Sequence, residues 1–272
     1  MSWHIGMVTV FALAGSFLSL TTPVSSVQKP PFSMVNLWTG QEQIQLEQEA
    51  RLITVKILSS PREIGSNNRS LGSGVLFYKE DHKNHLTSTY GVITNNHVLQ
   101  AGEAPYSIQT PDGKIHRADL VATKKQLRGN DLALLEFAAD PEYKIPTKSN
   151  QQPAIGDWII SAGFPLKNSQ SESGGFVIKD GKIQLLLDQA LEGGYQIGFT
   201  NDVEKGMSGG PLLNSAGELI GINGLHANPI WGDPYVFEDG SYPTDAKRKQ
   251  ISQYSWGIPL QTVSQLLIAK SK

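Results

Sequence analysis

Short β-rich runs, each ending in turn-forming residues, dominate this sequence and restrict its fold more than any other feature. About six such runs lie between residues 51 and 137, and a second set lies between residues 157 and 259. Gly, Pro, Asn or Asp separates the runs, as expected between antiparallel strands. Helical stretches do not alternate with them, which argues against a parallel α/β sheet. The pattern predicts an all-β protein built from two packed antiparallel β-barrels.

Helical patterns occur at both ends of the β-rich region. The segment GQEQIQLEQEA at residues 40–50 predicts a short helix that packs ahead of the first strand. A closing helix is predicted near the end of the chain, with one apolar face made by Leu260, Val263, Leu266 and Leu267. A polar, Pro-rich stretch at residues 138–156 separates the two sets of strands. Within the sets, the Asp-Gly pairs of PDGK (111–114) and KDGK (179–182) predict hairpin turns.

The first 26 residues are typical of a signal peptide. They contain no Asp, Glu, Lys or Arg, and their apolar stretch from Ile5 to Leu20 is shorter than the roughly 20 residues of a membrane-spanning helix. Small side chains favour cleavage before Val27, and an uncleaved membrane anchor is the alternative. Either way we expect an exported protein, periplasmic or secreted, without stable membrane insertion after signal cleavage.

These features divide the chain into consecutive parts. We expect a signal peptide at 1–26, an N-terminal segment with a short helix at 27–51, and a single domain at 52–272. Within that domain we expect barrel one at about 52–138, barrel two at about 154–259 and the closing helix at 260–270.

Composition excludes several classes of function. The chain has 23 Lys and Arg against 25 Asp and Glu, so its net charge of −2 provides no broad basic field for nucleic acid. It contains no cysteine, which excludes disulfides, thiolate metal sites and a cysteine nucleophile. Any covalent catalysis by this chain must therefore use another side chain.

One stretch, EKGMSGGPLLN at residues 204–214, surrounds Ser208 with three glycines. A serine hydroxyl is a poor nucleophile unless a base, an orienting acid and an oxyanion site accompany it. The candidate base is His97 in GVITNNHVL, which follows a predicted strand. The candidate acid is Asp131 in GNDLALLEF, at the entrance to an apolar strand where a carboxylate can be partly buried and directed at an imidazole.

The order His, Asp, Ser in these contexts resembles the trypsin- and chymotrypsin-like serine peptidases. The similarity is greater to the bacterial HtrA-type and glutamyl-endopeptidase-like branch, without a PDZ domain, and it covers roughly residues 52–268. Six motifs occur in the order of that branch: GSGVLF, VITNNHVL, NDLALLEF, IGDWIISAGFP, GMSGGPLLN and YSWGIP. The resemblance implies a trypsin-like fold and a serine endopeptidase that cleaves proteins or peptides, with no cofactor and no metal.

The resemblance also implies a role for each residue of the site. His97 takes the proton of Ser208, and Asp131 fixes the imidazole tautomer. The backbone N–H groups of Gly206 and Ser208 form the oxyanion hole. Trypsin-like zymogens need an Asp just before the serine to pair with a new N-terminus, but Met207 occupies that position here. We therefore expect the oxyanion loop either to be held without this ion pair or to rearrange when substrate binds.

Residues around the serine are candidates for the substrate pocket. Asp202 stands six positions before Ser208, where trypsin-like enzymes place the acid that selects Arg or Lys, whereas Lys205 would oppose a basic side chain. The strand GINGLHA is expected to form one wall of the pocket, which places Asn223, Gly224, Leu225 and His226 near the residue being recognised. The aromatic and Pro-rich segment 227–254 is expected to cover the cleft, to mediate self-association or to pack as a surface loop.

Three other interpretations follow from the residues. The protein could be a protease-like binding module of the cell envelope without turnover, although such modules usually lose a triad member. GMSGG also fits the nucleophile elbow of α/β-hydrolases, but that fold needs an acid and then a histidine after the serine. The only histidine after Ser208 is His226, and it precedes the acids Asp233, Glu238, Asp239 and Asp245. EDHKNH at residues 80–85 resembles a metal site, but its composition favours an exposed hairpin tip. The sequence does not determine the oligomeric state.

Overall fold

The structure, a computed structural model, describes residues 40–59, 68–82, 87–140, 142–167, 172–227 and 234–270. The expected signal peptide and the segment before residue 40 lie outside these ranges. Within them, most of the regular structure is β-strand, arranged in two closed barrels, with one helix before the first barrel and another after the second along the chain. The predicted fold class is therefore confirmed.

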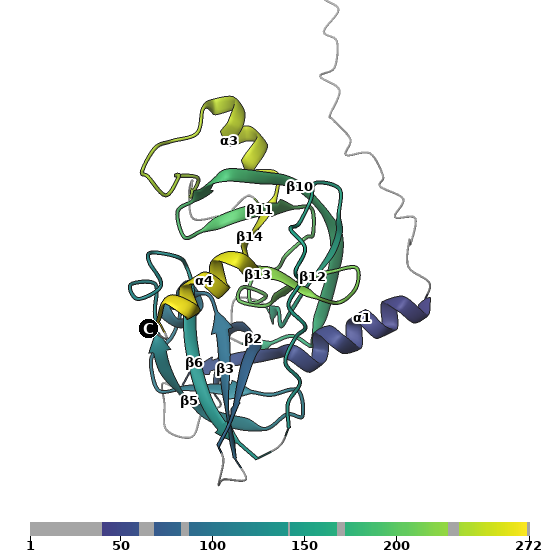
Figure 1. Ribbon diagram of the computed structural model, residues 1–272, viewed down its shortest axis with the longest axis vertical. Helices are drawn as coiled ribbons and strands as arrows, with labels where there is room; N and C mark the ends of the chain where they lie inside the picture. The colour runs from purple at the N-terminus through teal and green to yellow at the C-terminus, as the bar shows by residue number, and fades with distance from the viewer. Residues whose placement is uncertain are drawn as a thin grey trace, which may run out of the picture. The chain divides into compact units, whose positions relative to one another are not determined.

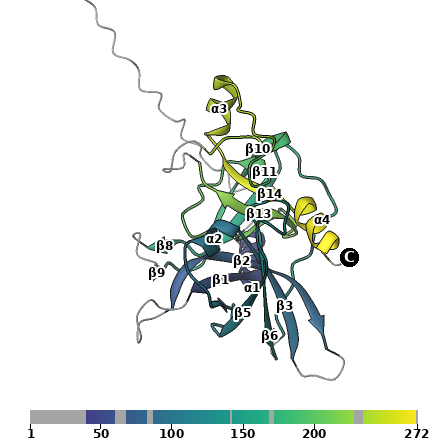
Figure 2. The same ribbon diagram turned by 90° about the vertical axis from the view of Figure 1, so that its left-hand side faces the viewer.

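The first barrel uses six antiparallel strands in the order β1-β2-β3-β6-β5-β4, and pairing of β1 with β4 closes it. Its strands occupy the lower part of Figure 1. They are β1 (Thr54–Ser59), β2 (Arg69–Asp81), β3 (Ser88–Thr94), β4 (Tyr106–Gln109), β5 (Ile115–Ala122) and β6 (Ala133–Ala139). A short helix, α2 (Asn96–Gln100), leaves the end of β3 on the side where the two barrels meet (Figure 2).

The second barrel has the strand order β10-β11-β14-β13-β12-β7 and lies in the upper part of Figure 1. Its strands are β7 (Trp158–Gly163), β10 (Val177–Leu191), β11 (Tyr195–Phe199), β12 (Pro211–Asn214), β13 (Leu219–Leu225) and β14 (Ser255–Pro259). A small ribbon pairs β8 (Leu166–Lys167) with β9 (Glu172–Ser173) between β7 and β10.

The two Asp-Gly pairs behave differently. PDGK forms the turn between β4 and β5, with Gly113 at a φ of 84°. The hairpin predicted at KDGK is wrong, because residues 179–182 run straight through β10 and pair with β7 in continuous register. A Cβ at Gly181 would lie 2.3 Å from Asn201 Oδ1, so this glycine is needed for a close approach of the chain and not for a turn.

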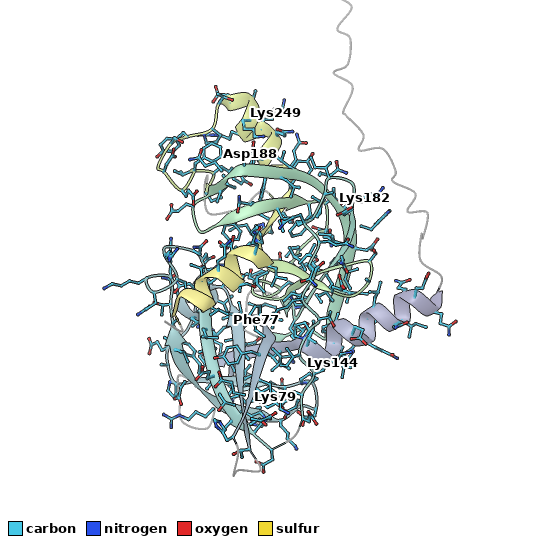
Figure 3. All side chains as sticks on the ribbon, in the orientation of Figure 1. Phe77, Lys79, Lys144, Lys182, Asp188 and Lys249 are labelled. Carbon is cyan, nitrogen blue, oxygen red and sulfur yellow. The ribbon has the colours of Figure 1, made fainter. Side chains whose placement is uncertain are left out.

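Three further helices flank the barrels: α1 (Gly40–Ile53), α3 (Asp245–Ile251) and α4 (Leu260–Lys270). The first continues through residues expected in the first strand, because Leu46, Ala50 and Ile53 are buried at helical spacing. Lys144 forms an ion pair with Glu49 of α1, and Lys144 is labelled in Figure 3. No helix within the described ranges is long and apolar enough to cross a membrane.

The structure also explains α3, which the sequence reading did not predict. Thr244 caps this helix by accepting a hydrogen bond from the Lys247 backbone N–H, and Asp245 lies in the first turn. Before α3, segment 234–241 forms backbone hydrogen bonds with the end of β10, from Glu192 N–H to Val236 O (2.7 Å) and from Glu238 N–H to Ala190 O (3.0 Å). The described part of the long loop is therefore attached to the second barrel.

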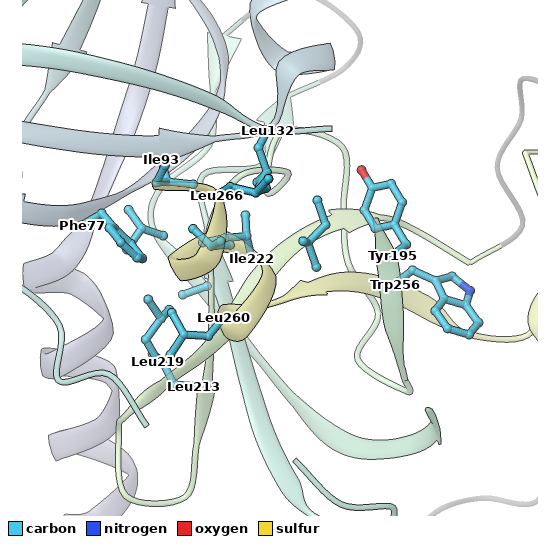
Figure 4. Close-up of a cluster of buried hydrophobic side chains, with 14 of the residues drawn as sticks. Phe77, Ile93, Leu132, Tyr195, Leu213, Leu219, Ile222, Trp256, Leu260 and Leu266 are labelled. Atoms are coloured by element: carbon cyan, nitrogen blue, oxygen red, sulfur yellow. The ribbon is translucent and has the colours of Figure 1, made fainter. Parts of the chain in front are cut away.

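The largest apolar cluster lies between the barrels and fixes one against the other. Ile93 and Leu132 come from the first barrel, and Ile222 and Trp256 from the second (Figure 4). Leu260, Val263 and Leu266 of α4 pack against the same cluster, as predicted, and Leu267 is partly buried beside it. Each such side chain contributes about 1.5–3 kcal/mol when fully buried. This shared core therefore holds the residues of the site, which come from both barrels, in one arrangement.

Candidate active site

His97 lies at the start of α2, directly after β3. Val98 and Leu99 are buried in the core of the first barrel, whereas the His97 side chain is 41% exposed. The short helix thus anchors its apolar residues and leaves the imidazole free to face solvent. His97 also donates its backbone N–H to Asp131 Oδ1 at 2.9 Å, which fixes the residue at two points on the same carboxylate.

Asp131 lies just before β6, and its side chain is 13% exposed. Its Oδ2 is 2.6 Å from His97 Nδ1. Burial acts to raise the pKa of Asp131, but hydrogen bonds and the charge interaction with His97, together with a hydrogen bond from Tyr195, lower this pKa below its usual 3.8. The group is therefore an ionised carboxylate and accepts a hydrogen bond from the Nδ1–H of His97. Nε2 of His97 is left as the ring nitrogen able to take a proton.

Ser208 lies in the tight turn before β12 and faces the cleft that His97 lines. Its Oγ donates a hydrogen bond to Gly224 O at 3.0 Å. A hydroxyl has one proton to donate, so transfer to His97 requires that proton to leave Gly224 O. Rotation about the side-chain bonds of Ser208 would turn the hydroxyl toward His97. Hydrogen bonds between a catalytic serine and histidine commonly tighten only when substrate binds.

The loop that precedes Ser208 is held by hydrogen bonds to three of its carbonyl groups. Leu166 N–H donates to Lys205 O at 2.8 Å, and Ser73 Oγ donates to Gly206 O at 2.7 Å. Met207 O accepts from Asn223 Nδ2 at 3.0 Å and from the backbone N–H of residue 210. The Met207 side chain is fully buried. The structure thus holds this loop by packing and neutral hydrogen bonds where trypsin-like zymogens use an Asp.

Two backbone amides are left without a partner by this arrangement. Among the described residues, no acceptor binds the N–H of Gly206 or of Ser208. Gly206 has a φ of 98°, and a Cβ there would lie 2.7 Å from Phe164 O, so only glycine fits this backbone conformation. Unpaired amides beside a reactive hydroxyl are suited to stabilise negative charge on a bound carbonyl.

The cleft between the barrels has a volume of about 870 Å³, within the range of small-molecule and peptide sites. Its lining joins residues from both barrels and from the long loop. They are Asn96, His97, Gln100, Lys124, Asp131, Leu166, Glu192, Gly193, Tyr195, Lys205, Ser208, Gly224, Leu225, His226, Pro234 and Val236. The three triad candidates therefore share one cleft.

The structure separates the pocket candidates into two groups. Lys205, Gly224, Leu225 and His226 line the cleft beside Ser208. Asp202 is exposed and does not belong to the lining. Its neighbour Asn201 is buried instead, and its Nδ2 donates to Lys179 O at 2.7 Å. Asp202 therefore faces solvent and does not line the pocket, although its spacing of six residues before Ser208 suggests a pocket position.

The EDHKNH segment lies partly outside the described residues, which end at His82 and resume at residue 87, so His85 is not among them. Asp81 accepts a hydrogen bond from Ser88 Oγ and pairs with Lys79, and His82 contacts Thr89 at 2.8 Å. No cluster of three or more metal-binding side chains occurs among the described residues.

Two residues at the site, Ser73 and Tyr195, were not predicted from the sequence. Ser73 belongs to the GSGVLF motif, where two flanking glycines were a usable signal of close packing. Asn223 was expected in the pocket wall, but its side chain instead donates to Met207 O and supports the loop before Ser208. Tyr195 donates its hydroxyl to Asp131 Oδ2 at 2.5 Å, and nothing in its local sequence distinguishes it from an ordinary core tyrosine.

Fold and site together define a two-barrel hydrolase-like protein with an imidazole, a carboxylate and a hydroxyl in one interbarrel cleft. The family model of the trypsin-like peptidase domain matches residues 72–222, more than half of the chain. The chain belongs to this family.

Curated relatives carry related names. The chain is 29% identical over 213 residues to "Serine endoprotease DegS" of Haemophilus influenzae, covering 72% of this chain and 56% of that protein. It is 34% identical to "Periplasmic pH-dependent serine endoprotease DegQ" of Escherichia coli, covering 56% of this chain and 30% of that protein. It thus spans about half of the first relative's length and under a third of the second's.

A solved structure, the serine endoprotease from Yersinia pestis, has the same fold. It matches with a TM-score of 0.57 and 22% identity, covering 83% of this chain and 65% of that one.

Proposed function

We propose that this protein is a serine endopeptidase that hydrolyses peptide bonds of proteins. The observation that carries the proposal is the contact of 2.6 Å between His97 Nδ1 and Asp131 Oδ2 in the same cleft as Ser208. The free amides of Gly206 and Ser208 add an oxyanion site next to the hydroxyl. Relatives named as serine endoproteases support the same activity.

The reaction proceeds in two halves. His97 Nε2 takes the Ser208 proton while Oγ attacks the substrate carbonyl, and the oxyanion forms against the amides of Gly206 and Ser208. His97 then protonates the leaving amine, and an acyl-enzyme remains on Ser208. Water, activated by His97, hydrolyses this ester and restores the hydroxyl. Asp131 keeps the proton on Nδ1 and stabilises the imidazolium in each half.

Fluorophosphonate labelling tests the nucleophile directly. We expect the wild-type protein to be labelled at Ser208, and Ser208→Ala to show no labelling while retaining the wild-type circular dichroism spectrum. Digestion of an unfolded protein substrate by the wild type, and not by Ser208→Ala, then identifies peptide bonds as the target. A folded wild type that neither labels nor cleaves would instead support the silent binding module.

The substrate side chain before the cleaved bond is proposed to lie against Lys205, Gly224, Leu225 and His226. These residues line the cleft next to Ser208, and none of them carries a carboxylate. Asp202 is exposed and outside that lining, which does not support a trypsin-like selection of Arg or Lys.

We further propose export with cleavage before Val27, followed by an N-terminal segment to residue 51 and a peptidase domain at 52–272. The apolar start of the chain supports this, as does the word "periplasmic" in the names of DegQ and of a Haemophilus influenzae relative, "Probable periplasmic serine protease do/HhoA-like", with 31% identity. N-terminal sequencing of protein recovered from the periplasmic fraction tests it. A mature protein that begins at Met1 would contradict the cleavage.

A further inference from the structure

The carboxylate of Asp131 is held by the second barrel as well as by the first. The Asp131 backbone N–H donates a hydrogen bond to Gly193 O, in the turn between β10 and β11, at 2.8 Å. The next strand begins with Tyr195, whose hydroxyl donates to Asp131 Oδ2, the same oxygen that contacts His97 Nδ1. Asp131 therefore donates one hydrogen bond across the barrel interface, to Gly193 O, and accepts another, from Tyr195, in addition to those from His97.

The surroundings of Tyr195 show that this contact is built into the core. The ring is 2% exposed and belongs to the apolar cluster between the barrels, with its hydroxyl directed away from Trp256 (Figure 4). A Cβ at Gly224 would lie 2.4 Å from the ring and 2.5 Å from its oxygen. Gly224 is also the residue whose carbonyl accepts the Ser208 hydroxyl. Because residue 224 has no side chain, the Tyr195 phenol fits beside it. The phenol therefore hydrogen-bonds to Asp131 and packs against Gly224, the residue that accepts the Ser208 hydroxyl.

We propose that Tyr195 is a positioning residue of the triad, which orients the Asp131 carboxylate and moderates its attraction for the proton of His97. This inference rests on the proposed peptidase function. The phenol and the imidazole both donate to Oδ2, so the negative charge on that oxygen is shared between them. A weaker donor at 195 leaves more of this charge to stabilise the imidazolium, and a stronger donor leaves less.

Tyr195 can act as a donor throughout the working pH range. Burial, the nearby charge of Asp131 and the hydrogen bond to it raise the pKa of Tyr195 well above its usual 10. The phenol therefore stays protonated at neutral pH and remains a hydrogen-bond donor to Asp131. Besides Asp131 and Tyr195, the titratable groups that line the cleft around His97 are Lys124, Glu192, Lys205 and His226, and none of them is altered in the test.

The test replaces the phenol by Tyr195→Phe, which removes the hydroxyl and keeps the ring. We expect the midpoint of the acidic limb of kcat/KM to move up by about half a pH unit to one unit, because the imidazolium becomes easier to form. We also expect the plateau of kcat/KM to fall roughly tenfold, since the carboxylate loses a charge-assisted hydrogen bond that orients it. The pH midpoint of the His97 Cε1 proton signal in NMR should move in the same direction.

Tyr90→Phe is the matched control. Tyr90 is fully buried in the first barrel, and its hydroxyl accepts the Tyr143 backbone N–H at 3.1 Å, away from the cleft. It should lose stability without moving either midpoint. If Tyr195→Phe behaves like this control, with both midpoints unmoved, the proposal is overturned and Tyr195 is only a core residue.

A second variant protects the test from a folding failure. Incorporation of 3-fluorotyrosine at position 195 keeps the ring and hydroxyl but makes the phenol a stronger donor, so both midpoints should move down. Midpoints that stay in place in this variant would also refute the proposal. The NMR midpoint needs no turnover, and labelling of wild-type Ser208 is measured separately, so failure of the peptidase function is distinguishable from failure of this inference.

Discussion

Replacement of Ser73 by alanine should loosen the proposed oxyanion loop while leaving the three triad candidates in place. Ser73 is fully buried on β2 of the first barrel, but its hydroxyl contacts two backbone groups of the second. Oγ donates to Gly206 O at 2.7 Å and accepts the Phe164 N–H at 2.9 Å. The hydroxyl therefore links the peptide after Gly206 to the end of β7, and this link sets the direction of the amides that flank it.

The magnitude follows from what the alanine variant leaves unpaired. Ser73→Ala leaves one buried carbonyl and one partly buried N–H without a partner, each at about 1–3 kcal/mol, so we expect a loss of unfolding free energy of about 2–6 kcal/mol. Complete loss of one oxyanion donor costs about 2.7–4 kcal/mol in the transition state. A loosened donor costs less, so we expect kcat to fall roughly 10- to 100-fold. KM should change little, because the oxyanion contact develops in the transition state.

Steady-state kinetics on a peptide substrate and urea denaturation measure these two effects. Ser70→Ala is the control on the same strand, since the Ser70 hydroxyl is buried and has no hydrogen-bond partner within the described residues. It should leave kcat at the wild-type value and cost little or no stability. If Ser73→Ala keeps the wild-type kcat while folded, the loop does not depend on this hydroxyl and the reasoning is wrong.

Three other predictions concern the carboxylates. Asp131→Asn should lower kcat by about 10⁴ with the fold retained, measured by kinetics and circular dichroism, because an amide no longer enforces the Nδ1–H tautomer; a loss under tenfold would contradict the assigned role. The lowered pKa of Asp131 also predicts that its stabilising contribution is present above its unfolded pKa of about 3.9 and is lost as the pH falls through the folded value. The stability difference between wild type and Asp131→Asn, measured by urea denaturation at pH 6 and pH 3, should therefore shrink at the lower pH. Asp202→Ser should leave the cleavage profile on a peptide library unchanged, and a lost preference for Arg or Lys would instead place Asp202 in the pocket.

Local sequence patterns predicted the structure correctly where interactions between residues close in the sequence control it. The turn at PDGK and the apolar face of α4 follow from nearest neighbours along the chain, and both were predicted. At KDGK the same dipeptide occurs within β10, because pairing with β7 and the close approach of Asn201 outweigh the turn preference of Asp-Gly. The end of α1 was misplaced for a similar reason, since burial of Ile53 against the barrels extends the helix.

The same difference between local and long-range control applies to the residues of the candidate site. His97, Asp131 and Ser208 were predicted as candidates from short motifs, and the structure brings them to one cleft, because each lies at a strand end or glycine turn that has a local sequence pattern. Asp202 was placed by its distance from the serine, and the loop conformation, which depends on the buried Asn201, turns it to solvent.

The sequence by itself determined the β-rich architecture and the family, and it supplied the candidate reactive side chains, since these depend on periodicity and on local motifs. Only the tertiary structure decided how those side chains are supported. Ser73 holds Gly206, and Tyr195 shares the carboxylate of Asp131, across an interface between barrels that are distant in sequence. Hydrogen bonds of this kind depend on the packing of the shared core, and packing between remote strands leaves no pattern along the chain.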